Sequence, residues 1–220
     1  MFKDIRIALI FGVVLLDIIG IGIIFPIIPD LLKEVGIDKT ANAAFWGGLL
    51  SSSYAFMQFV FSPTIGTLSD IFGRRPVLLT ASILLGIDYL LMGFAENILI
   101  LFIGRIIGGL AGGTIATGTA YLADISDTKD KKKNFAIIGA AFGLGFILGP
   151  IIGGLMGEIS VRAPFFLSAV LSFLNFFLCL FLLPETLKVG TKNKFRIKKL
   201  NPFFNISYVF KIFVSIISIS

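Results

Sequence analysis

Long apolar runs separated by short polar segments make up most of the chain. Six runs of 20 to 24 residues lie at about 6–28, 45–66, 76–95, 98–121, 134–157 and 164–183. At a rise of 1.5 Å per residue, a helix of this length crosses a hydrocarbon core of about 30 Å. A seventh run, 206–220, is interrupted by Lys211 and is too short to span comfortably. The pattern predicts an all-α membrane protein with six transmembrane helices and the start of a seventh.

The composition supports this class. Hydrophobic residues make up 56% of the chain and charged residues 15%, below the roughly 25% of soluble domains. The chain contains one cysteine, Cys179, and no histidine, which excludes a disulfide framework and a histidine proton relay within it. It has neither a phosphate-binding G-x-x-x-x-G-K-[ST] loop nor a metal-ligand cluster. We therefore expect a protein that is not an enzyme and holds no cofactor or metal.

Lys and Arg are distributed unevenly between the polar segments. Fourteen of the 19 lie in 3–6, 74–75, 129–133 and 188–199, which six crossings place on one side of the membrane. Three lie on the other side, at Lys33, Lys39 and Arg162. Because basic loops stay in the cytoplasm, we expect a multi-pass protein of the cell (inner) membrane with a cytoplasmic N-terminus. The net charge of +6 thus indicates membrane lipid as a partner and not nucleic acid.

The distribution of charge also divides the chain into parts. We expect a six-helix transmembrane domain at 1–187, a basic cytoplasmic linker at 188–205 and the truncated start of a seventh helix at 206–220. A specific site for lipid headgroups in the basic run is the alternative to a simple linker.

A short motif recurs after 88 residues. The pattern G-x-x-x-[DE]-I-x-x-R-x-P begins at Gly66 and again at Gly154. The first copy follows the second predicted helix and the second copy follows the fifth, so the two copies lie on opposite sides of the membrane. We therefore expect helices one to three and four to six to be related by inverted topology, as in the repeats of one transporter half.

Four polar residues inside the apolar runs are candidates for function: Asp17, Gln58, Asp88 and Arg105. A charge at the bilayer centre costs about 2.5–3.5 kcal/mol on insertion scales, so it is expected to face a cavity or a partner. We interpret Asp17 as a proton- or cation-binding group and Arg105 as a cavity cation that pairs with Asp17 or with another proton site. Three alternatives stay open: a neutral Asp17 that bonds a helix, a hydrated Asp88 and an Arg105 that extends to the headgroups. Gln58 binds either substrate or a neighbouring helix.

The stretch 66–76, G-T-L-S-D-I-F-G-R-R-P, is expected to be a tight turn at the membrane surface. Its glycines allow close approach or positive φ, its proline suits the first turn of the next helix, and its aspartate is placed to pair with an arginine. A basic turn that only fixes orientation is the alternative. The candidate residues are Gly66, Asp70, Gly73, Arg74, Arg75 and Pro76.

The fifth run carries a stripe of glycines around Pro150. Glycines four residues apart share one helix face and allow another helix to approach closely, and the proline is expected to kink the helix. The stripe consists of Gly145, Gly149, Gly153 and Gly157, and Gly154 stands beside it.

The stretch 66–76 resembles the loop between the second and third helices of the major facilitator superfamily, G-x-L-[AS]-D-x-[FY]-G-R-[RK]-P. Over about 6–187, the chain is most similar to the tetracycline-efflux group of drug/proton antiporters, on strings such as Y-A-F-M-Q-F-V-F-S-P, I-D-Y-L-L, F-G-L-G-F-I-L-G-P-I-I-G-G and the P-E-T at Pro184. The resemblance implies that the loop is a cytoplasmic gate latch between two halves of a transporter. It also implies that the glycine string lies at the seam between the halves, and that Asp17, Gln58, Asp88 and Arg105 contribute to transport.

The resemblance implies proton-coupled efflux of a drug-like, tetracycline-like small molecule, driven by the proton gradient and carried as a complex with a divalent metal. The group has twelve helices in two halves, and this chain matches the N-terminal half. We favour a truncated reading frame that is inactive alone. A split subunit completed by a C-terminal half, a homodimer and a non-transporting membrane module are the alternatives. With that half missing, the gate loop and the glycine stripe are expected to face lipid or nothing.

Overall fold

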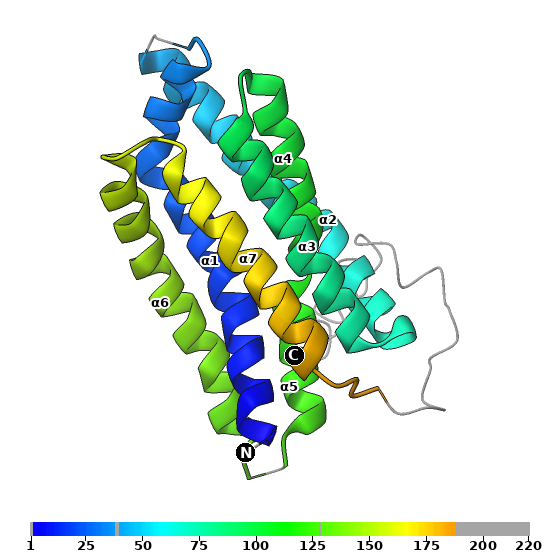
Figure 1. Ribbon diagram of the computed structural model, residues 1–220. Helices are drawn as coiled ribbons and strands as arrows, with labels where there is room; N and C mark the ends of the chain where they lie inside the picture. Colours follow the sequence, from blue (N-terminus) through cyan, green and yellow to red (C-terminus); the bar gives the residue numbers. More distant parts are fainter. Residues whose placement is uncertain (1, 38–39, 128, 188–220) are drawn as a thin grey trace, which may run out of the picture.

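The computed structural model describes residues 2–37, 40–127 and 129–187, and every regular element within these ranges is an α-helix (Figure 1). The helices are α1 (Phe2–Glu34), α2 (Thr40–Phe72), α3 (Arg74–Phe94), α4 (Ile98–Ala111), α5 (Thr114–Ile125), α6 (Lys131–Gly157) and α7 (Ala163–Leu182). They form one elongated bundle, which confirms the all-α prediction. The expected linker, 188–205, and the start of the seventh helix, 206–220, lie outside the described residues.

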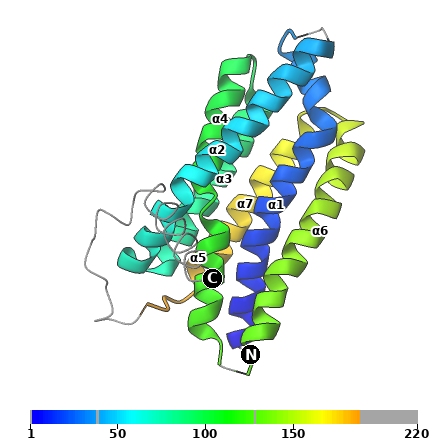
Figure 2. The same cartoon turned by 180° about the vertical axis from the view of Figure 1, so that it is seen from behind.

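Five stretches of the described chain are long and apolar enough to cross a membrane: Ile5–Glu34, Arg74–Phe94, Ile98–Ile125, Lys131–Gly157 and Ala163–Leu182. The α2 helix is not among them. It is as long as α1, at 33 residues, but three consecutive serines and Gln58 make its middle more polar. It packs against α4 along the bundle (Figure 2), so the bundle retains the six predicted segments.

The fourth apolar run, expected as one helix over 98–121, is divided. α4 ends at Gly112, whose N–H donates to the carbonyl of Gly109 at 3.1 Å, and α5 begins after Gly113. Close packing explains the break. A Cβ atom at Gly112 would lie 2.3 Å from Cγ of Gln58, and one at Gly113 would lie 2.1 Å from Cγ2 of Ile65. The two glycines thus let α2 approach the middle of this run.

The predicted turn at 66–76 is shorter than expected. α2 continues through Phe72, and only Gly73, at φ 113°, interrupts the helix before α3 begins at Arg74. Gly66 lies inside α2 with no heavy atom within 4 Å of the position of a Cβ, so its assignment to the turn is wrong. Gly73 has the predicted positive φ, and Pro76 lies in the first turn of α3.

The two copies of the repeated motif lie at opposite ends of the bundle. The turn before Arg74 adjoins the start of α1, the end of α5 and the end of α7, and we call this the basic end. The turn before Arg162 adjoins Glu34 at the end of α1 and Gly93 near the end of α3. The inverted relationship between the two three-helix repeats is thus confirmed.

The glycine stripe of α6 packs against α1, and the expectation that it would face lipid or nothing is wrong. A Cβ at Gly149 would lie 2.7 Å from Cα of Gly22 and 2.8 Å from the carbonyl oxygen of Ile19, and one at Gly153 would lie 2.9 Å from the carbonyl oxygen of Ile23. These glycines therefore set the spacing between two long helices, which lie side by side in both views (Figures 1 and 2).

Other residues of α6 point away from α1. Gly154 is exposed, with open space around it, and Ile151 is exposed as well, whereas the exposed Pro150 has its Cδ 3.0 Å from the position of a Cβ on Gly22 of α1. The helix remains continuous through the proline. One face of α6 thus packs within this bundle, and the other carries residues that are exposed among the described parts of the chain.

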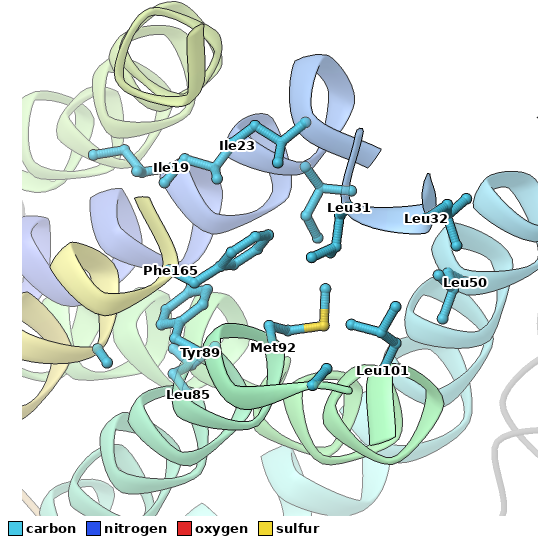
Figure 3. Packing of buried hydrophobic residues seen from close by; sticks show 14 of the residues in the cluster. Ile19, Ile23, Leu31, Leu32, Leu50, Leu85, Tyr89, Met92, Leu101 and Phe165 are labelled. Carbon is cyan, nitrogen blue, oxygen red and sulfur yellow. The ribbon is translucent and has the colours of Figure 1, made fainter. Parts of the chain in front are cut away.

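The largest apolar cluster lies where α1 meets α3, α4 and α7. Ile23, Tyr89, Met92 and Phe165 are each at most 2% exposed and point toward one another (Figure 3). This packing joins the two repeats and holds the polar residues described next at fixed positions.

Candidate functional site

Asp17 lies in the middle of α1 and is 1% exposed. Its Oδ1 accepts a 2.9 Å hydrogen bond from the hydroxyl of Tyr54, and its Oδ2 accepts a 3.1 Å hydrogen bond from the hydroxyl of Thr114. The break between α4 and α5 places Thr114 at the start of a helix, facing α1. A buried carboxylate is thus held by two hydroxyl groups from two other spans.

Arg105 on α4 forms a buried ion pair with Asp88 on α3. The side chains are 2% and 1% exposed, so Arg105 does not extend to the headgroups and Asp88 is not hydrated at a surface. Gly104 and Gly108 make the contact possible. A Cβ at Gly108 would lie 2.2 Å from Oδ2 of Asp88. Arg105 therefore pairs with Asp88 and not with Asp17.

Tyr54 on α2 connects the two carboxylate sites. Its hydroxyl donates to Asp17, and its ring lies beneath the guanidinium of Arg105, with Cζ 5.2 Å from the ring centroid. A cation over an aromatic face is attracted by the ring quadrupole. Tyr54 was not among the residues singled out from the sequence. It lies one helical turn before Gln58, on the same face of α2, and this spacing could have identified it.

The charges in this cluster do not balance. Among the described residues, Asp17, Asp88 and Arg105 are the charged side chains that are buried. If all three are ionised, the net charge is −1, and the unmatched carboxylate is Asp17, since its two direct partners are hydroxyl groups. A proton or one positively charged ligand would neutralise the cluster.

A cavity of about 260 Å³ opens beside the cluster. Its polar lining comes from Ser51, Tyr54, Gln58 and Arg105, and its apolar lining from α1 and α2. Its volume is slightly below the roughly 300–1,000 Å³ of pockets for drug-sized ligands. The half-buried Gln58 lines the cavity and also lies 3.5 Å, through Nε2, from the carbonyl oxygen of Gly112, so it is positioned for both of its expected roles.

The predicted ion pair of the gate loop is present. Nη1 of Arg74 lies 2.5 Å from Oδ1 of Asp70 and 2.5 Å from the hydroxyl of Ser69. Nε of Arg74 lies 3.3 Å from Oδ2 of Asp124, at the end of α5. Asp124 also accepts a 3.1 Å hydrogen bond from the hydroxyl of Thr186. One guanidinium therefore connects the turn to two other segments.

Glu185 caps the start of α3. Its carboxylate accepts hydrogen bonds from the backbone N–H of Arg74 at 3.0 Å and of Arg75 at 3.1 Å, groups that have no partner within the helix. Glycine is favoured at position 73 because its φ of 113° strains other residues, and a Cβ there would also lie 2.2 Å from Oε2 of Glu185. The gate loop thus has partners within this chain, and the contrary expectation is wrong. In the sequence, Glu185 stood out only because the P-E-T string resembles that of the tetracycline-efflux group.

The described ranges contain no group of three or more His, Cys, Asp or Glu side chains arranged to hold a metal ion. The site consists of two parts, a buried cluster around Asp17 and a polar network at the basic end.

Inverted helical repeats around a buried charged cluster define a membrane transporter fold. The chain belongs to the Major Facilitator Superfamily, whose family model matches residues 10–219. This assignment makes it a member of a family of transporters.

Individual relatives narrow the class. The chain is 42% identical over 193 residues to the class C tetracycline resistance protein of Escherichia coli, covering 88% of this chain and 48% of the relative. It is 32% identical over 203 residues to the quinolone resistance protein NorA of Staphylococcus aureus (strain Mu50 / ATCC 700699), covering 92% and 50%. The chain thus spans about half the length of these relatives.

A solved structure has the same fold. The human organic anion transporter MFSD10 (TETRAN) superposes with a TM-score of 0.78 at 24% identity, over 90% of this chain and 53% of that chain. At this identity, the likeness supports the arrangement of the helices alone.

Proposed function

We propose that this chain forms one half of a transporter that exports a drug-like small molecule of the tetracycline type in exchange for protons. Relatives named for resistance to tetracycline and to quinolones support export of a drug. The observation that carries proton coupling is the environment of Asp17, a buried carboxylate with two hydroxyl partners beside an arginine already paired with Asp88.

Charge balance suggests how exchange operates. With a proton on Asp17 the buried cluster is neutral, and without it the cluster carries one negative charge. A substrate with one positive charge, such as a drug bound to a divalent metal, stabilises the deprotonated cluster. Because proton and substrate compensate the same charge, binding of one favours release of the other, as exchange requires.

The proposed exchange also gives roles to the basic end, to the network around Arg74 and to the segments of the chain. The basic end lies in the cytoplasm and the protein in the cell (inner) membrane, in accordance with the distribution of Lys and Arg. The network around Arg74 acts as a cytoplasmic latch. The residues 1–187 form one domain, 188–205 a linker, and 206–220 the start of the next helix.

A second six-helix half is the proposed partner. The 260 Å³ cavity is lined by α1, α2 and Arg105 of α4, and α6 presents exposed residues, including Gly154 and Ile151. In transporters with two halves, the substrate site lies between the halves. The chain alone is therefore expected to bind weakly and not to transport.

The test is transport after completion of the second half. The chain is co-expressed with the C-terminal half of the Escherichia coli class C relative, and everted vesicles with an acidic interior are given tetracycline and Mg²⁺. We expect gradient-driven uptake. The matched control is the relative itself, divided at the same position, which verifies that two separate halves assemble. If that control transports and our hybrid takes up no drug, the proposed substrate is wrong.

The role of Asp17 is tested in the same vesicles. Asp17→Asn keeps the shape and one of the two acceptor oxygens but does not titrate. We expect gradient-driven uptake to fall by about a hundredfold or more at equal protein abundance, since general acid–base groups typically contribute about 10²–10⁴-fold. Unchanged uptake would mean that Asp17 is a structural group, and would favour the alternative of a membrane module whose polar residues only join helices.

A further inference from the structure

A second cavity, of about 550 Å³, lies at the basic end, away from Asp17. It is bounded by the start of α1, the start of α3 and the end of α7. Its lining consists of Ile5, Arg6, Arg75, Phe181, Leu182, Leu183 and Pro184. It therefore combines two guanidinium groups with an apolar wall.

The α7 helix lies between α1 and α3 in both views (Figures 1 and 2). Arg75 bonds the end of α7 directly, and Arg6 is connected to the residues after α7 through Tyr121. Nη2 of Arg75 donates a 2.6 Å hydrogen bond to the carbonyl oxygen of Leu180. The side chain of Arg6 hydrogen-bonds the hydroxyl oxygen of Tyr121, which in turn donates to the carbonyl oxygen of Pro184 at 2.9 Å. The positive groups are thus held at the cavity wall.

The nearby carboxylates are engaged elsewhere. Glu185 accepts the backbone N–H groups at the start of α3, and Asp70 and Asp124 pair with Arg74. The side chain of Arg75 has no carboxylate within ion-pair distance in the described chain, and its Nε has no hydrogen-bond partner there. In the described residues, Arg75 therefore brings to the cavity a guanidinium without a side-chain ion pair, while the carboxylate of Glu185 accepts its backbone N–H.

The apolar wall continues along the outer face of α7. Val170, Leu174, Phe177 and Phe181 are 51–78% exposed and recur at intervals of three and four residues, so they form one stripe along the helix. In a membrane protein, such a stripe contacts acyl chains. The stripe ends at the cavity, which Phe181 lines together with Arg6 and Arg75.

We propose that the cavity binds an anionic phospholipid, with its phosphate between Arg6 and Arg75 and its acyl chains along the stripe of α7. Arginine matches phosphate because its planar fork presents paired donors, and basic pockets at the ends of transmembrane helices select anionic headgroups. This site is separate from the cluster around Asp17, with which it shares no residue, and Arg75 is the residue that it shares with the stretch 66–76.

The test is lipid retention by the purified chain. Equal amounts of phosphatidylglycerol and phosphatidylcholine are added in detergent, and the bound lipid is counted by native mass spectrometry. We expect phosphatidylglycerol to be retained at least fivefold over phosphatidylcholine. Arg6→Gln with Arg75→Gln should reduce the ratio to about one. Equal retention of both lipids by the unaltered chain would overturn the proposal.

Two further variants separate the site from general charge and from loss of folding. Lys132→Gln with Lys133→Gln removes two exposed charges at the start of α6. Neither lysine lines the cavity, so this change should leave the ratio unchanged. Leu182→Trp keeps both arginines but fills the cavity, and should lower the ratio. If the lysine pair lowers it as much as the arginine pair, or if Leu182→Trp leaves it unchanged, the site is not where we place it.

The acyl chains are tested by competition. A hundredfold excess of glycerol 3-phosphate, which carries the phosphate without chains, should leave most phosphatidylglycerol bound. Complete displacement would show that the cavity recognises soluble phosphate and that the stripe of α7 contributes nothing.

Discussion

The hydroxyl of Tyr54 donates a 2.9 Å hydrogen bond to Oδ1 of Asp17. This contact joins α2 to α1 at the centre of the bundle, and the ring of the same tyrosine supports the guanidinium of Arg105. The side chain of Tyr54 therefore contacts both Asp17 and the arginine that is paired with Asp88.

Tyr54→Phe should impair transport without unfolding the protein, because it removes the hydrogen bond and keeps the ring beneath Arg105. A hydrogen bond to a charged group contributes about 1.5–3 kcal/mol, so we expect a fall of roughly tenfold or more in the initial uptake rate of the completed transporter. Tyr89→Phe is the matched control, because it removes a buried hydroxyl that donates to the carbonyl of Leu16 and not to a carboxylate. Equal effects of the two changes would argue against a special role for Tyr54.

The ion pair of Asp88 and Arg105 should be far more sensitive to loss of one partner than to loss of both. Arg105→Gln leaves a buried carboxylate unpaired, which costs about 3–5 kcal/mol, and should lower the amount of protein in the membrane. Adding Asp88→Asn removes that charge and should restore abundance. Uptake should stay low in the double variant if the pair contributes to transport. Quantitative immunoblots and uptake per inserted molecule measure the two effects separately. A double variant less abundant than Arg105→Gln alone would contradict this account.

The network at the basic end should depend on geometry as well as charge. Arg74→Lys keeps the charge but loses the fork that reaches Asp70 and Asp124 together. Because ion pairs near a surface contribute about 0.2–1 kcal/mol, we expect the uptake rate to fall, by less than about sixfold. Asp70→Asn should act in the same direction. Normal rates in both variants would mean that the turn only fixes topology, since orientation depends on charge and not on shape.

Two glycines of α6 offer a test of packing. Gly149→Ala places a methyl group against the backbone of α1 and should destabilise the bundle by about 1–3 kcal/mol, the usual cost of overpacking. Gly154→Ala meets no atom within 4 Å and should leave the melting temperature of the isolated chain unchanged. If Gly154→Ala nevertheless reduces uptake in the completed transporter, the exposed face of α6 contacts the second half. Similar melting temperatures for both variants would contradict the packing against α1.

Cys179 provides a measure of unfolding without any substitution. It is the single cysteine of the chain and is fully buried in α7. A thiol reagent should therefore label the folded protein slowly and the detergent-denatured protein rapidly. Rapid labelling of the native chain would mean that α7 does not pack as described. The same assay distinguishes misfolded variants from inactive ones in the experiments above.

The length and apolarity of the runs were sufficient to locate the six segments, because a membrane span must be long, apolar and internally hydrogen-bonded, but not to predict the break between α4 and α5 or the end of α2 at Phe72. The repeat at Gly66 and Gly154 predicted the inverted arrangement. Pairing within the bundle was harder to predict. Asp17 and Asp88 are equivalent candidates for Arg105 in the sequence, and the choice depends on which helix faces Gly108. The cap by Glu185 was missed for a related reason, since it requires a contact across 111 residues.

Reciprocal ion pairs at the two ends of the bundle have a mechanical consequence. Arg74 begins the third helix of the first repeat and pairs with Asp124, while Arg162 precedes the third helix of the second repeat and pairs with Glu34 of the first. An ion pair thus joins the two repeats at each end of the bundle. Relative sliding of the two repeats would therefore break an ion pair at each end of the bundle.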